Sequence, residues 1–292
     1  MDAGLLSRIE ALLARLEPLL PPAAAPSDWT ALAYRWRTRD YVGGPRGRLE
    51  PVLRIARIEA ADLQHVERQK EALLANTAQF VRGLPANNVL LTGARGTGKS
   101  SLIRACLAAY AEQGLRLIEV DKRDLVDLPD IVACVAGRPE RFIVFCDDLS
   151  FEEGESSYKA LKAALDGSVA APGDNVLIYA TSNRRHLMPE YMRENLDTKY
   201  QEDGEIHPGE TVEEKISLSE RFGLWLSFRP FRQDDYLDIV DHWLRRFGLA
   251  DAQIAEGRAE ALQFALQRGS RSGRVALQFA RDYAGRRALG RA

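Results

Sequence analysis

The sequence has few cysteines and histidines and no long uncharged apolar run. Its three cysteines, Cys106, Cys134 and Cys146, are widely spaced within apolar stretches, which predicts reduced thiols in the core. The four histidines form none of the close pairs that zinc sites use. No stretch approaches about 18 uncharged apolar residues, and no basic segment precedes the first apolar residues, so neither a membrane-spanning helix nor a secretory signal is expected. We therefore expect a cytoplasmic protein that has no zinc centre and does not enter a membrane.

The chain also lacks an excess of charge of either sign. Forty basic residues, nearly all of them Arg, stand against 42 acidic ones, which gives a net charge of −2. This balance provides no overall field that would attract the protein to nucleic acid or to anionic lipid, so such a contact would need a local patch. The 292 residues are 46% hydrophobic and 28% charged, which excludes fibrous and disordered classes and allows one large domain or more.

Three parts are expected along the chain. Residues 1–50 form a small N-terminal unit with an amphipathic helix over 1–20, followed by aromatic residues mixed with Arg. Residues 51–230 alternate helical stretches with short apolar runs, which are typical of strands buried in a parallel sheet. The expected strands lie at 88–92, 116–120, 141–146, 176–180 and 224–228. Residues 231–292 contain only helical patterns and predict a separate helical domain.

The strongest chemical signal follows the first of these strands. The segment matches the phosphate-binding pattern G-x-x-x-x-G-K-[ST] in full and consists of Gly93, Ala94, Arg95, Gly96, Thr97, Gly98, Lys99 and Ser100. Glycines allow backbone N–H groups to point toward phosphate oxygens, and the helix that follows presents its positive end to the same anion. Lys99 is expected to reach the β- and γ-phosphates of ATP, and the Ser100 hydroxyl to bind Mg²⁺. Thr97 and Ser101 belong to the same candidate segment, although both are also typical of helix starts.

Two carboxylates end the strand at 141–146. Because ligands bind at the carboxyl ends of parallel strands, Asp147 and Asp148 are expected to face the glycine-rich segment. Asp147 would hold Mg²⁺, and Asp148 would orient or deprotonate an attacking water. The alternative is an ordinary turn or helix cap, for which Asp is also common.

Together these motifs resemble those of AAA+ ATPases, from about Ile55 to the C-terminus. Stretches such as Phe145-Cys-Asp-Asp-Leu-Ser-Phe, Ala180-Thr-Ser-Asn-Arg-Arg-His-Leu and Ser219-Glu-Arg-Phe-Gly-Leu-Trp-Leu-Ser-Phe resemble, more narrowly, the bacterial family called domain of unknown function 815. The resemblance implies an α/β P-loop core with a parallel five-stranded sheet of order 5-1-4-3-2 and a C-terminal helical lid. We expect the N-terminal unit to be mainly helical.

The resemblance also implies roles for residues outside the two motifs. Asn183 falls at the position of sensor 1, a polar residue that positions the water, and Arg221 at that of an arginine finger that enters a neighbouring subunit's site. Arg274 corresponds to sensor 2, with Arg271 as its rival, and Leu63 and Val66 correspond to the region that packs on adenine. Each also has an ordinary structural interpretation, as a turn residue, a surface arginine or a core side chain.

These features favour an ATPase that uses ATP and Mg²⁺, assembles as a homo-oligomer with shared sites and acts on an unidentified protein partner. Asp148 stands where many AAA+ enzymes have Glu, so slow hydrolysis is expected, and a nucleotide-gated binding module with little turnover is the main alternative. A DNA-associated role, suggested by the aromatic and Arg mixture between Trp29 and Arg48, is less favoured. The acidic segment 194–215 is expected to be a solvated loop or a partner-sensing insertion.

Overall fold

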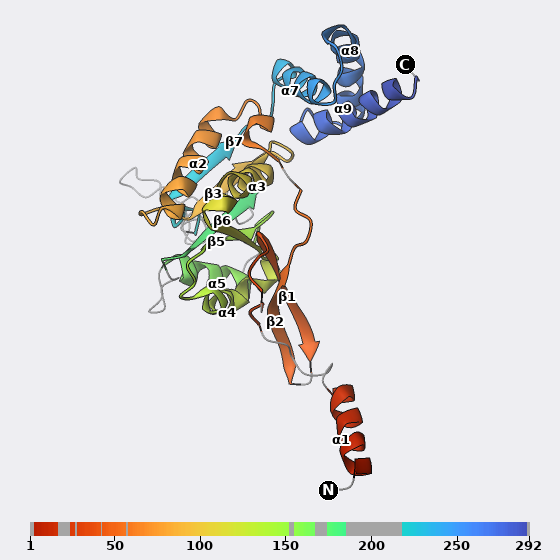
Figure 1. Ribbon diagram of the computed structural model, residues 1–292. Coiled ribbons are helices and arrows are strands. Elements are labelled where there is room, and N and C mark those ends of the chain that lie inside the picture. The colour runs from red at the N-terminus through yellow and green to blue at the C-terminus, as the bar shows by residue number, and fades with distance from the viewer. Residues whose placement is uncertain are drawn as a thin grey trace, which may run out of the picture.

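The computed structural model describes residues 3–16, 24–26, 28–41, 43–56, 58–151, 155–166, 174–184 and 218–290. Within these residues a seven-stranded sheet with the order β2-β1-β4-β5-β6-β3-β7 forms the centre of the protein (Figure 1). The strands are β1 (Ala33–Tyr41), β2 (Gly44–Pro51), β3 (Val89–Gly93), β4 (Leu115–Glu119), β5 (Arg141–Cys146), β6 (Val176–Ser182) and β7 (Leu224–Phe228). Every neighbouring pair is parallel except β1 and β2.

Five of these strands have the expected order. Numbered among themselves in chain order, β7-β3-β6-β5-β4 are the fifth, first, fourth, third and second strands, and all are parallel. The expectation of a five-stranded, wholly parallel sheet was nevertheless wrong, because β1 and β2 extend the sheet beyond β4.

The expectation of a mainly helical N-terminal unit was wrong for the same reason. Tyr34 and Trp36 alternate with Arg35 and Arg37 along β1, and only the two aromatic side chains are fully buried. Side chains that are buried at every second residue are typical of a strand with one buried face. Burial of the two large aromatic rings favours this extended backbone over a helix. The division of the chain into three domains stays a proposal.

Helices cover both faces of the sheet. On one face, α2 (Glu67–Val81) and α3 (Lys99–Tyr110) contribute Leu73, Phe80, Leu102 and Cys106 to a continuous apolar core. On the other face, α4 (Leu128–Val135) and α5 (Ser156–Leu165) enclose a second core. Short 3-10 turns, η2 (Ala60–Asp62), η3 (Ala111–Gln113) and η4 (Lys122–Asp127), complete the connections. The β-strands that carry the chemical motifs are thus fixed between two hydrophobic layers.

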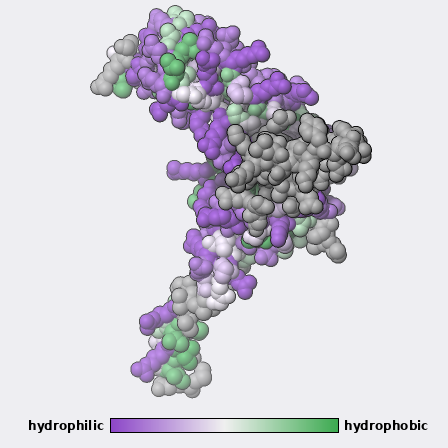
Figure 2. Space-filling view, turned by 180° about the vertical axis from the view of Figure 1, so that it is seen from behind, coloured by the Kyte–Doolittle hydropathy of each residue, from purple (hydrophilic) through white to green (hydrophobic). Residues whose placement is uncertain are grey.

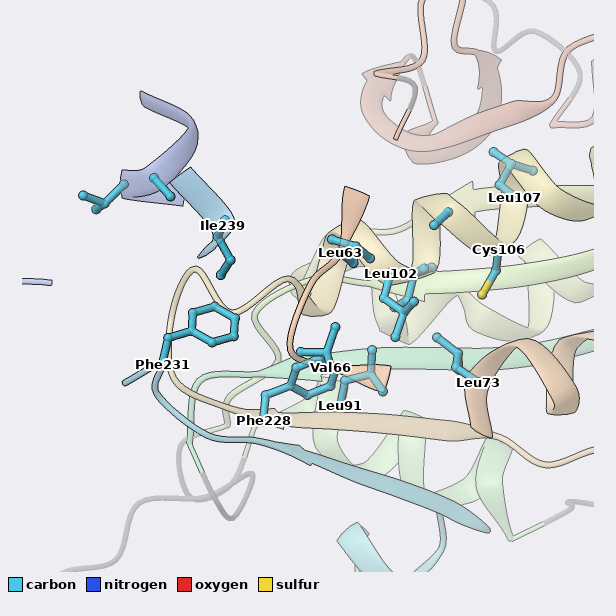
Figure 3. Packing of buried hydrophobic residues seen from close by; sticks show 14 of the residues in the cluster. Leu63, Val66, Leu73, Leu91, Leu102, Cys106, Leu107, Phe228, Phe231 and Ile239 are labelled. Atoms are coloured by element: carbon cyan, nitrogen blue, oxygen red, sulfur yellow. The ribbon is translucent and has the colours of Figure 1, made fainter. Parts of the chain in front are cut away.

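The last three helices, α7 (Gln233–Arg246), α8 (Asp251–Gln267) and α9 (Gly273–Ala288), pack on one another beyond the end of β7 and are called the helical bundle below (Figure 1). The first core continues into this bundle through Tyr236, Ile239 and Phe279. Figure 3 shows Val66, Leu91 and Phe228 packed together, with Phe231 and Ile239 on the bundle side of Leu63. The bundle therefore stands next to the carboxyl ends of the strands.

The first helix, α1 (Ala3–Leu16), lies beyond the β1–β2 hairpin at the far end of the molecule (Figure 1). Its Leu5, Ile9, Leu12 and Leu13 are exposed, and they form the green band at that end in Figure 2. None of the helices in the described part of the chain combines the length and the apolar character needed to span a bilayer.

All three cysteines are free thiols. Cys106 and Cys146 are buried, and burial raises the pKa of each thiol to about 12, whereas Cys134 is only half-buried. A protonated thiol is a poor nucleophile, so these two cysteines act as small apolar core residues.

Candidate nucleotide-binding site

A cleft of about 580 Å³ opens at the carboxyl ends of β3, β5 and β6. Its floor is the glycine-rich segment before α3, its side wall carries Asp147 and Asp148, and its roof comes from α7 and α9 of the helical bundle. Of the expected site residues, the cleft is lined by Leu63, Val66, Arg95, Gly96, Thr97, Gly98, Lys99, Ser100, Ser101, Asp147, Asp148, Asn183 and Arg274. Parallel strands bring these separate segments together because their ends meet at one edge of the sheet.

The glycines of the floor allow a backbone path that other residues would obstruct. Gly93 has a φ of 123°, and a Cβ at this position would lie 2.0 Å from the carbonyl oxygen of Phe228. Gly96 has a φ of 74°, and its Cβ would approach Ser272 Oγ to 2.8 Å. The segment therefore needs glycine both for its left-handed backbone and for close approach to β7 and α9.

The Lys99 side chain folds back onto the first residues of the glycine-rich segment. Its Nζ donates hydrogen bonds to the carbonyl oxygens of Gly93 and Ala94 at 2.7 and 2.8 Å and to Asn183 Oδ1 at 3.1 Å. The side chain is only 6% exposed, and burial lowers the pKa of Lys99, an effect that the charges of Asp147 and Asp148 oppose. The site thus contains a partly desolvated cation that an incoming polyphosphate would stabilise.

Ser100 and Asp147 form a pair of oxygen ligands. Ser100 Oγ donates to Asp147 Oδ1 at 2.6 Å, and Thr181 Oγ1 donates to the same oxygen at 2.5 Å. Mg²⁺ prefers hard oxygen donors, and in nucleotide sites it takes one or two from the protein and the rest from phosphate and water. Among the described residues no group of three or more His, Cys, Asp or Glu side chains gathers to form an all-protein metal cage. The Ser100–Asp147 pair fits Mg²⁺ bound together with a nucleotide.

Asp148 has an unusual backbone conformation, with a φ of 55°. Its backbone N–H donates to Thr181 Oγ1 at 2.9 Å, and its carboxylate accepts a hydrogen bond from Asn183 Nδ2 at 2.5 Å. Arg95 Nη2 lies 3.8 Å from the other carboxylate oxygen, Oδ2. Left-handed backbone at a non-glycine residue is costly and concentrates at functional sites, and here it turns the carboxylate into the cleft.

Thr181 is a site residue that the sequence analysis missed. Its hydroxyl contacts the Asp147 carboxylate and the Asp148 backbone N–H. A sequence signal was available, because Thr181 directly follows the expected strand 176–180 as Asp147 follows the strand 141–146, and the structure pairs the residues before them, Ala180 and Cys146. Ile239 and Trp243 of α7 also line the cleft and were missed, since an amphipathic pattern does not say which apolar residues face a ligand.

The apolar wall of the cleft includes Leu63 and Val66, which are 8% and 5% exposed. They follow η2, whose Asp62 pairs with Arg246 of α7 and lies 3.3 Å from His242 Nε2. These contacts join the segment that carries Leu63 to the helical bundle.

The three arginines named in the sequence analysis occupy different places. Arg274 stands in the first turn of α9 and lines the cleft, next to Gly273, whose N–H donates to the Gly96 carbonyl at 2.9 Å. Arg271 is exposed and is not among the lining residues. Arg221 lies ahead of β7, pairs with Asp166 at the end of α5, and does not line the cleft of its own chain. The acidic segment 194–215 lies outside the described residues.

Comparisons with known proteins bear on the family and the fold. The model of the family described as Protein of unknown function (DUF815) matches residues 30–287. No curated protein matches the chain. Three solved variants of RuvB from Thermotoga maritima are similar to it, with TM-scores of 0.50, 0.51 and 0.51 and sequence identities of 18%, 17% and 16%.

The aligned regions cover 76%, 78% and 80% of this chain and 63%, 65% and 67% of the RuvB chains. This chain thus spans about two thirds of the length of those proteins. At such identities the likeness concerns the fold alone, which is the α/β P-loop fold of AAA+ proteins.

Proposed function

The chain belongs to the family described as Protein of unknown function (DUF815), and we propose that it binds ATP with Mg²⁺ in the cleft and hydrolyses the ATP slowly. One observation carries this proposal. Lys99, Asp148 and Asn183 come from three separate segments and join in one hydrogen-bonded network at the cleft. A phosphate-binding cation, a carboxylate and the amide that orients both are the parts that phosphoryl transfer to water requires.

Each residue of the network has a distinct proposed role. Lys99 would exchange its bonds to backbone carbonyls for the β- and γ-phosphate oxygens, which compensates its lost hydration. Asp148 would orient the attacking water and accept its proton, while Asn183 fixes the carboxylate. Arg274 would reach the phosphates from the bundle side of the cleft.

Ser100 and Asp147 would hold Mg²⁺, which when bound neutralises charge on the phosphate oxygens. Leu63 and Val66 would pack on the base, together with the apolar side chains that α7 contributes to the same wall.

We also propose that the site is shared between copies of the chain. Arg221 stands outside its own cleft, at the amino end of β7, whereas the cleft opens at the carboxyl ends of the strands. It could act as an arginine finger only in the cleft of a neighbouring copy. Homo-oligomeric assembly is therefore part of the proposal, and the Gly273–Gly96 hydrogen bond would transmit nucleotide occupancy to the helical bundle and from there to a protein partner.

A second candidate function is a nucleotide-gated binding module with little turnover. It is favoured by the short side chain of Asp148, which is already engaged by Asn183 and faces Arg95. In this case ATP would organise the bundle without being consumed at a useful rate.

The test compares binding with turnover in the full chain. Binding of ATP is measured by calorimetry with Mg²⁺, and hydrolysis by release of inorganic phosphate. Lys99→Ala should weaken ATP binding by roughly 10- to 100-fold, because a charge-assisted hydrogen bond contributes about 1.5–3 kcal/mol. Asp148→Asn should retain binding and lose at least about 100-fold in turnover.

Asp174→Asn is the matched control, since it removes an exposed carboxylate at the opposite end of β6. If ATP binds tightly and the small turnover of the intact chain is unchanged by Asp148→Asn, the protein is the binding module and not an ATPase.

A further inference from the structure

The β1–β2 hairpin extends past the edge of the sheet. β1 pairs with β4 only through Ala33–Arg35, so the rest of β1, as far as Tyr41, pairs with β2 alone. Figure 1 shows the two strands running outward from the sheet. A two-stranded ribbon has little stability of its own, so one of its faces is expected to be fixed by the rest of the protein.

One face of the hairpin is held against η4. Trp36 Nε1 donates to Asp127 Oδ2 at 2.9 Å, and Thr38 Oγ1 lies 3.2 Å from carboxylate oxygens of both Asp124 and Asp127. The indole of Trp36 also lies over Gly47, where a Cβ would come within 2.0 Å of the ring. Because Trp36 is 2% exposed, its ring cannot stack on the bases of a nucleic acid, as the aromatic and Arg mixture had suggested.

The opposite face carries five arginines. Side chains alternate along a strand, so Arg35, Arg37 and Arg39 share the face away from Trp36. The register places Arg48 opposite Arg37, Arg46 opposite Arg39, and Glu50 opposite Arg35. Like charges directly opposite each other destabilise a strand pair, so this face carries unfavourable repulsion in the free protein.

The face has too few carboxylates to neutralise it. Glu50 lies 2.6 Å from Arg48 and 3.0 Å from Arg39, and these guanidinium groups lower the pKa of its carboxyl, Arg48 most strongly. Arg35 pairs with Glu119 of β4. In the part of the chain that the structure describes, no ion pair joins Arg37 or Arg46 to a carboxylate.

We propose that this arginine face, Arg35, Arg37, Arg39, Arg46 and Arg48, binds the phosphate backbone of nucleic acid without reading base sequence. Guanidinium groups bind phosphate oxygens through paired hydrogen bonds, and a bound polyanion relieves the repulsion between the facing arginines. A protein partner is less well matched, because protein interfaces are centred on apolar and aromatic side chains and this face adds to its arginines only one aromatic residue, Tyr41 at its outer end.

The face also adjoins the nucleotide cleft. Arg35 and Arg37 line a recess of about 820 Å³ that extends past Asp121 to Asp147 and Asp148. The recess also contains Glu119 and Asp124, and its five carboxylates would repel a phosphate backbone, so a nucleic acid would stay on the arginine face. The binding itself does not depend on ATP hydrolysis.

The test measures binding of the full chain to fluorescein-labelled DNA by fluorescence anisotropy, with single strands and duplexes of two unrelated sequences. Affinity should be similar for both sequences and should fall as salt rises from about 50 to about 200 mM, with a log–log slope of roughly −2 to −4. The double variant Arg37→Ala/Arg46→Ala should weaken binding to both sequences and reduce the slope by about 1 to 2.

The double variant Arg268→Ala/Arg281→Ala removes the same charge from the helical bundle and should leave binding within roughly twofold. Thermal unfolding checks that both variants are folded. The proposal is overturned if the intact chain shows no salt-dependent binding, or if the hairpin variant binds like the bundle variant. It is also overturned if polyglutamate displaces the DNA at equal charge concentration, because the face would then fit an acidic protein. None of these outcomes bears on ATP binding, which is measured separately.

Discussion

Asn183 donates a hydrogen bond from Nδ2 to Asp148 Oδ1 over 2.5 Å, and its own Oδ1 accepts one from Lys99. One amide thus orients both the proposed base and the proposed phosphate-binding cation. Replacement by Ala should lower turnover about 100-fold, the usual effect of removing one positioned donor, with little change in ATP affinity. Phosphate release and calorimetry measure the two quantities.

Asn175→Ala is the control for that variant, because Asn175 donates its amide to the Val135 carbonyl at the opposite end of β6. It should lower thermal stability without changing turnover of the folded protein. Equal loss of ATP binding and turnover in Asn183→Ala would assign Asn183 a purely structural role.

Shared sites make a second prediction. Arg221→Ala should reduce turnover by up to about 1000-fold in the assembled protein, because the transition-state charge loses its arginine, while ATP still binds. Asp166→Asn breaks the same ion pair but keeps the arginine, so its turnover should be close to that of the intact chain.

Turnover of mixed assemblies of two variants tests the shared site more strictly. Arg221→Ala and Asp148→Asn chains are each inactive alone, but in mixed assemblies the Asp148→Asn copies would supply Arg221 to intact clefts. Turnover should therefore recover on mixing. No recovery in assemblies shown by mass to be mixed would contradict the arginine finger.

Lys99 makes a third prediction, on the pH dependence of stability. Burial lowers the pKa of Lys99 in the folded protein below its ordinary value, so the unfolded chain binds the proton more tightly. As pH rises through the folded-state pKa toward the unfolded-state value, Lys99 loses its proton in the folded protein first. The cost of burying its charge then disappears, and the folded protein gains stability. The unfolding free energy of the ligand-free intact chain, measured in urea, should therefore rise relative to that of Lys99→Met between neutral pH and pH of about 10.

Lys159→Met is the control, since Lys159 is an exposed residue of α5. The stability difference between this variant and the intact chain should not change over the same range. A relative fall for the Lys99 comparison would show that the charge stabilises the empty site.

The thiols make a fourth prediction. With pKa values raised to about 12 by burial, Cys106 and Cys146 carry almost no thiolate at pH of about 8 and should not react with Ellman's reagent in the folded protein. Burial also raises the pKa of Cys134, but this residue is half-buried and should react slowly. Cys134→Ser should abolish the slow reaction, and all thiols should react after unfolding. A rapid reaction that persists in Cys134→Ser would place one of the other thiols at the surface.

The core of the fold could be predicted because its signals are local. An apolar run followed by a complete phosphate-binding pattern determines strand, turn and helix around Lys99, and parallel strand order then brings Asp147 and Asn183 to the same edge. β1 was missed because its alternating Arg and aromatic residues suggested a surface feature, whereas Tyr34 and Trp36 complete a core that other segments build. Which apolar residues of the bundle face the cleft could not be predicted, since that depends on how Arg246 and Gly273 dock on Asp62 and Gly96.

Among the described residues, three segments of the P-loop core hold the bundle through the chain itself or through polar contacts. The chain itself passes through Phe231, and Gly273 bonds to the Gly96 carbonyl. In the third segment Asp62 pairs with Arg246, and His65 lies within 3.4 Å of Asp235 and 3.1 Å of Asp238. A rigid body held at three points that are not in line cannot turn, but release of one point leaves the line through the other two as a hinge axis. Nucleotide that displaces the Gly96 contact would leave an axis through Phe231 and the segment of Asp62 and His65, so the far ends of α8 and α9 would move through the widest arc.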